Sequence, residues 1–108
     1  MLWVDGVEVA SLEVADTYRR RLRGLLGRDG IDGAILFRPG NSVHTLGMRF
    51  PIDVAHCDAD LRVLRTITMV PHRLGRAVRG TKVVIEAEAG QFERWQLSAG
   101  SQLRVTDR

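Results

Sequence analysis

The sequence predicts an α+β domain dominated by β-strands, built as a small curled antiparallel or mixed sheet, or a partial barrel, with two short helices. Three observations predict it: apolar and polar residues alternate in short segments, Gly, Pro and Asp separate these segments, and only two segments have helical spacing. About seven short strands with few helices fold as sheets around one core. With 108 residues the chain is predicted to form a single domain, residues 1–108.

The first half of the chain contains three predicted strands and a helix. Residues 2–9 alternate around Asp5-Gly6, a dipeptide typical of two-residue hairpins, and residues 11–15 continue as a strand. Residues 16–27 begin with an Asp-Thr pair that can cap a helix, carry leucines at helical spacing and end in glycine. Residues 34–37 form an apolar segment before a Pro-Gly turn, which indicates a buried strand.

The middle of the chain has the pattern of a β-hairpin. Residues 52–57 and 61–70 flank a short acidic turn, Asp-Ala-Asp. In the second arm Arg65 falls in phase with apolar residues, whereas Leu64 faces the other way. A β-bulge at this point would restore the alternation.

The last elements are predicted to be a strand, a short helix and a final strand. Residues 82–88 alternate, with one interruption at Val84. The residues predicted to face inward are Val83, Ile85 and Ala87, and those predicted to face outward are Lys82, Glu86 and Glu88. Residues 91–96 place Phe92 and Trp95 on one side of a helix, and residues 102–106 follow a Ser-Ala-Gly turn as a strand.

Composition excludes several classes of protein. A single cysteine, Cys57, allows no intramolecular disulfide, and no segment has the length and apolar character of a membrane span or an export signal. We therefore expect a cytoplasmic monomer or small homo-oligomer with no membrane partner. The net charge is only +3, so the arginines at 19–23 and 73–79 are interpreted as solvated faces. We do not expect a nucleic-acid partner, although weak nonspecific binding is kept as a third hypothesis.

The segment from Val43 to Asp53 is the candidate site. Its Gly, Pro and short polar residues favour a loop, and this loop carries more functional groups than turn formation requires. Imidazole can act as donor, acceptor or base near neutral pH, and guanidinium can bind a carboxylate or phosphate bidentately. The candidate ligand-binding residues are His44, Thr45, Met48, Arg49 and Asp53.

Two functions are compatible with this loop, and whether the protein is an enzyme stays open. The preferred hypothesis is a binding module for a small anionic or polar ligand. The alternative is a hydrolase or transferase in which His44 acts as acid and base, Asp53 orients it and Arg49 stabilises negative charge. A purely structural interpretation also fits: Arg49 pairs with Asp53, His44 caps a buried carbonyl, and Met48 fills the core.

Other constellations of reactive residues are weaker. The potential metal ligands are His44, His56, Cys57, Asp58 and His72. Their spacing does not match known metal sites, so we predict no metal and no cofactor. Glu86 and Glu88 lie two apart on one strand face and could form a carboxylate pair, but alternating solvent-facing positions explain them equally well.

The central segment Val-His-Thr-Leu-Gly-Met-Arg-Phe-Pro-Ile-Asp, residues 43–53, resembles the signature of domain-of-unknown-function family 192, also called UPF family 0127, from bacteria and archaea. The supporting motifs are Val14-Ala15-Asp16-Thr17, Arg23-Gly24-Leu25, Asp58-Ala59-Asp60, Val84-Ile85-Glu86, Ala89-Gly90, Leu97 and Gly100. The chain departs from the family pattern at Tyr18, Arg19 and Ser101, outside the central signature. The resemblance implies a small β-rich domain and supplies no established activity, cofactor or catalytic residue.

Overall fold

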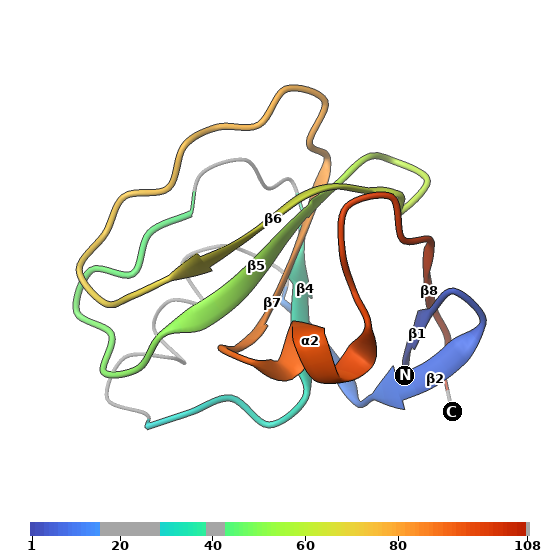
Figure 1. Cartoon of the computed structure of the whole chain (residues 1–108), viewed down its shortest axis with the longest axis horizontal. Coiled ribbons are helices and arrows are strands. Elements are labelled where there is room, and N and C mark those ends of the chain that lie inside the picture. The colour runs from blue at the N-terminus through green and yellow to red at the C-terminus, as the bar shows by residue number, and fades with distance from the viewer. Residues whose placement is uncertain (16–28, 39–42, 108) are drawn as a thin grey trace.

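A computed structural model of the chain describes residues 1–15, 29–38 and 43–107, which form two β-sheets and one short helix (Figure 1). The elements are β1 (Leu2–Val4), β2 (Val7–Ala10), β3 (Leu12–Ala15), β4 (Ala34–Phe37), β5 (Ile52–Cys57), β6 (Val63–Met69), β7 (Val83–Glu88), α2 (Gln91–Trp95) and β8 (Leu103–Val105). Each predicted strand and the second predicted helix are confirmed. The helix predicted over residues 16–27 lies outside the described residues, so two short helices are not confirmed.

The smaller sheet joins the two ends of the chain in the order β2-β1-β8, with both pairs antiparallel. Asp5 and Gly6 connect β1 to β2 with φ angles of 48° and 85°, as a type I′ hairpin turn requires. The Asp5 carboxylate accepts a hydrogen bond of 2.8 Å from the Gln102 backbone N–H. The hairpin predicted from the Asp-Gly pair is therefore present, and β8 is held beside it.

The larger sheet is mixed, in the order β3-β4-β7-β5-β6. Only β3 and β4 run parallel, and the other neighbours are antiparallel. The prediction of a mixed sheet is confirmed, but the alternative of a partial barrel is wrong. The chain passes from the small sheet into the large one between β2 and β3, and three strands separate the edge strands β3 and β6. Among the described residues, no pairing between these edges closes the sheet.

Both faces of the larger sheet are covered. One face packs against the small sheet and α2, and Figure 1 shows α2 in front of β7 and beside the small sheet. The other face carries a second core cluster that includes Val43, Met48 and Phe50. Because β7 lies in the middle of the sheet, the predicted outward position of Glu86 is wrong: its exposed fraction is 0%.

The predicted bulge in the second arm of the central hairpin is present. Cys57 is opposite Val63, whereas His56 is opposite Arg65, so Leu64 is the extra residue in β6. Residues of β6 beyond the bulge are thereby shifted to the opposite face. Arg65 comes to lie on the same face of the sheet as its partner His56, which places both at the site described next.

Candidate ligand-binding pocket

Thr45, near the start of the 43–53 segment, connects this segment to the residues after β6. Its side chain is fully buried. The hydroxyl donates to the Val70 carbonyl at 2.7 Å and accepts from the Arg73 N–H at 2.9 Å. The Thr45 N–H donates to the Arg73 carbonyl, and its carbonyl accepts from His72 N–H, both at 2.9 Å. Thr45 therefore fixes the position of residues 70–73.

Two further candidate residues have partners within the fold. Met48 is 2% exposed and belongs to the second core cluster. Asp53 is buried, and one carboxylate oxygen accepts the Thr68 hydroxyl at 2.6 Å. The other oxygen accepts the backbone N–H groups of Gly90 and Phe92 at 2.9 and 3.2 Å. Asp53 thus binds the first turn of α2, where backbone N–H groups have no partner within the helix.

His44 and Arg49 remain accessible. His44 is half-buried, accepts the Leu46 N–H at its Nδ1 at 3.2 Å and forms an isolated β-bridge with Leu74. Arg49 lies 3.6 Å from Asp29, and both side chains are largely exposed, so this ion pair stabilises the fold by about 0–1 kcal/mol. Three of the five candidates are therefore buried within the fold and two are accessible, and ligand binding by them as a group stays a prediction.

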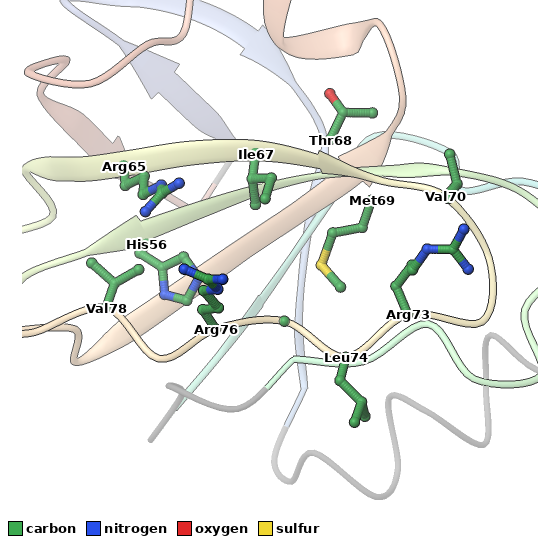
Figure 2. A pocket seen from close by; sticks show the side chains of 11 residues that line it. His56, Arg65, Ile67, Thr68, Met69, Val70, Arg73, Leu74, Arg76 and Val78 are labelled. Atoms are coloured by element: carbon green, nitrogen blue, oxygen red, sulfur yellow. The ribbon is translucent and has the colours of Figure 1, made fainter.

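A pocket of about 380 Å³ lies between β6 and the segment that follows it (Figure 2). Its lining residues are His56, Arg65, Ile67, Thr68, Met69, Val70, Arg73, Leu74, Gly75, Arg76 and Val78. The lining combines several apolar side chains with three guanidinium groups, and no Asp or Glu is among these residues. Figure 2 shows His56, Arg65, Arg76 and Val78 at one end, and Val70 and Arg73 at the other.

Residues 70–78 form the second wall of the pocket. Hydrogen bonds to residues 43–45, on the side away from the pocket, fix the position of this wall. In addition to the Thr45 contacts, Gly75 N–H donates to the Val43 carbonyl at 2.8 Å. A Cβ atom at residue 75 would lie 2.8 Å from that carbonyl oxygen and 3.4 Å from the Met69 side chain. Glycine is therefore required here for the wall to approach both the loop and β6. Residues 43–48 therefore hold the pocket wall in position, although none of them lines the pocket.

His56 is the buried polar residue of the pocket. Its side chain is 2% exposed, and Nδ1 lies 3.2 Å from the Thr81 hydroxyl oxygen. That hydroxyl donates to the Val78 carbonyl at 2.7 Å. Burial, and secondarily the positive charge of Arg65, lower the pKa of His56 from its ordinary value of 6.5. At neutral pH the imidazole is uncharged, and the three arginines supply the positive charge of the pocket.

The sequence pattern identifies the pocket residues only in part. In the sequence, Arg73 and Arg76 belong to a basic segment interpreted as a solvated face, His56 is a potential metal ligand, and Arg65 interrupts the alternation of its strand. The informative signal is the combination of His56 and Arg65. An arginine in an apolar strand face, opposite a histidine in the paired strand, indicates a polar site on a hairpin.

Other reactive groups do not assemble into a second centre in the part of the chain that the structure describes. Within residues 1–15, 29–38 and 43–107, no three His, Cys, Asp or Glu side chains are grouped so that they could hold a metal ion. Cys57 is buried, and burial, with a smaller effect of Asp58, raises the pKa of its thiol to about 12. No helix among these residues is long and apolar enough to cross a membrane.

The fold and the pocket define a small β-rich domain with a basic cavity beside an edge strand. The model of the family DUF192, described as uncharacterized ACR, matches residues 2–105, and the chain belongs to this family. The resemblance of residues 43–53 is thereby confirmed. No match was found among curated proteins.

Two solved structures share the fold. A protein of unknown function from Novosphingobium aromaticivorans has a TM-score of 0.81 and 22% identity, over 96% of this chain and 83% of the other. A protein from Sinorhizobium meliloti, proposed to be a transcription regulator, has a TM-score of 0.73 and 24% identity, over 86% of this chain and 79% of the other. At these identities the likeness concerns the fold alone.

Proposed function

We propose that the protein is a binding module for a small organic anion with an apolar body, held in the pocket between β6 and residues 70–78. The observation that carries this proposal is the lining: Arg65, Arg73 and Arg76 surround apolar side chains, with no carboxylate among the lining residues. Guanidinium groups bind carboxylates and phosphates through paired charge-assisted hydrogen bonds. The volume of about 380 Å³ suits a small molecule.

The ligand proposed here is an anion, as expected from the sequence, but its proposed site is the pocket beside β6 rather than the 43–53 segment. The 43–53 loop contributes indirectly, because Thr45 holds the backbone of Arg73 in the pocket wall. The alternative of a hydrolase or transferase based on His44 stays a prediction. In that alternative Asp53 was to orient His44, yet both oxygens of Asp53 bind Thr68 and the start of α2.

A calorimetric and thermal-shift comparison at low, fixed salt tests the proposal. The probes are short branched-chain carboxylates and small phosphate monoesters. A probe present at about 100 times its Kd stabilises the protein by about 2.7 kcal/mol, a rise in Tm of about 10 °C for a domain of this size. Arg65→Gln and Arg76→Gln are each expected to weaken binding about tenfold.

The matched control is Arg79→Gln, because Arg79 is also exposed and is close in sequence but does not line the pocket. It changes the net charge by the same amount and should leave affinity unchanged. Equal losses in all three variants would indicate general attraction of anions rather than a pocket. Binding of a short oligonucleotide with a steep loss of affinity in salt, and no binding of small anions, would instead support the nucleic-acid hypothesis.

A further inference from the structure

We propose that the pocket selects carboxylates that also carry a hydroxyl group, and that His56 makes this selection by accepting a hydrogen bond from the hydroxyl at its Nε2. This inference rests on the proposed function, since it specifies which small anion the pocket binds. It is carried by the hydrogen-bond chain from His56 through Thr81 to Val78, which determines where the imidazole proton resides.

The Thr81 hydroxyl has a single hydrogen, and its oxygen lies 2.7 Å from the Val78 carbonyl oxygen. A carbonyl oxygen can only accept, so the hydroxyl hydrogen points to Val78. The hydroxyl oxygen must then accept in its contact of 3.2 Å with Nδ1 of His56. Nδ1 therefore donates and carries the proton of the neutral imidazole. Nε2 is left with a lone pair, which makes it an acceptor.

The surroundings keep His56 in this neutral form. The charged side chains that share the pocket lining with it are Arg65 on β6 and Arg73 and Arg76 on the opposite wall. Burial disfavours a positive charge on the imidazole most strongly, and the charge of Arg65 disfavours it further. The imidazole is thus a hydrogen-bond acceptor placed among cations, a combination that suits a ligand with both an anionic group and a donor.

Nε2 is the ring nitrogen that is left for a ligand. Among the described residues the hydrogen bonding of the His56 ring is with Thr81, through Nδ1. The ring lines the pocket, and Figure 2 shows it at the same end as Arg65 and Arg76. A carboxylate bound by these arginines would have its adjacent hydroxyl near His56, while its apolar chain extends toward Ile67 and Met69.

The same geometry disfavours an amino group in place of the hydroxyl. An ammonium group could also donate to Nε2, but it would bring a positive charge beside the guanidiniums that hold the carboxylate. A carboxylate without any donor would leave Nε2 unpaired when the ligand excludes water from the pocket. We therefore expect the order of affinity hydroxy acid, then unsubstituted acid, then amino acid on one carbon skeleton.

Three probes with the same skeleton test this order at pH 7.5: 2-hydroxy-4-methylpentanoate, 4-methylpentanoate and leucine. One hydrogen bond to a buried acceptor corresponds to about a tenfold lower Kd for the hydroxy acid than for 4-methylpentanoate. Leucine is expected to bind more weakly than either. Equal affinities for the first two acids overturn the role of His56 but leave anion binding intact. No binding of any probe overturns both this inference and the proposed function for carboxylates.

Two substitutions at His56 separate its two nitrogens. The amide of His56→Asn occupies the position of Nδ1 and cannot reach that of Nε2, whereas the longer His56→Gln places an amide oxygen near Nε2. The tenfold preference for the hydroxy acid should therefore disappear in His56→Asn and persist in His56→Gln. Loss of the preference in both variants, or in neither, contradicts the assignment.

A measurement on the unsubstituted protein avoids any effect of the variants on folding. In protein labelled with ¹⁵N in the histidine rings, the His56 resonances should report a protonated Nδ1 and an unprotonated Nε2. Adding the hydroxy acid should move the Nε2 resonance, whereas 4-methylpentanoate should move it far less. A protonated Nε2 in the free protein at pH 7.5 would overturn the inference directly.

Discussion

His56 and Arg65 lie directly opposite each other on β5 and β6 because Leu64 is bulged out of the ladder between the two strands. Without the bulge, Arg65 would be displaced by one residue and its side chain would point to the other face of the sheet. A local irregularity in one strand therefore brings an imidazole and a guanidinium into the same pocket. The further properties of the pocket depend on this pairing.

Protonation of His56 should make the stability of the fold depend on pH. Its pKa in the folded state is lowered from 6.5 by burial and by Arg65, so the unfolded chain binds more protons in the interval below pH 6.5. The free energy of unfolding should therefore have its full contribution from His56 above about pH 7. It should decrease as the pH falls from 6.5 toward the pKa of the folded state. Urea unfolding at pH 5, 6, 7 and 8 measures this slope. His56→Gln should reduce it, and an unchanged slope in that variant would contradict the assignment to His56.

Replacing Asp53 by Ala should destabilise the protein by about 2–4 kcal/mol. The substitution removes the acceptor for two backbone N–H groups at the start of α2 and for the Thr68 hydroxyl, and it leaves the buried Phe92 N–H without a partner. Urea denaturation measures the loss. Asp60→Ala is the control, because Asp60 is exposed in the hairpin turn, and a similar loss in both variants would show that Asp53 has no special role.

Thr45→Val should cost about 1–3 kcal/mol and loosen the pocket wall. The side chain keeps its shape but loses the hydroxyl that donates to Val70 and accepts from Arg73. Amide hydrogen exchange of Arg73 should accelerate more than exchange in β7. Thr66→Val, in β6, serves as the control for loss of a threonine hydroxyl. Unchanged exchange at Arg73 would show that Thr45 does not hold this segment.

Cys57 should resist thiol reagents in the folded protein. Burial raises the pKa of its thiol to about 12, so at pH 8 only about one thiol in 10⁴ is ionised, and the thiolate is the reactive form. Labelling with a chromogenic disulfide reagent should therefore proceed only as fast as the protein unfolds, and should become rapid in urea. Rapid stoichiometric labelling of native protein would contradict the buried position of Cys57.

The strands and turns were predictable because their signals are local. The apolar segment 34–37 and the hairpin pattern around the acidic turn predict the observed bounds of β4 and β5, and the disturbed alternation at Arg65 predicts the bulge. The turn at Asp5-Gly6 follows from the ability of these residues to adopt positive φ angles. Each of these features depends on neighbours within a few residues, and the sequence contains that information directly.

The sequence alone therefore determined a β-rich domain of the DUF192 family, with most of its strands in place. Only the tertiary structure decided that Glu86 is buried, that Asp53 binds α2 and that His56 faces a basic pocket. The physical reason is that burial and hydrogen bonding at these residues depend on which strands become neighbours and what covers each face. Those contacts join residues far apart in the chain, so no local pattern of residues could specify them.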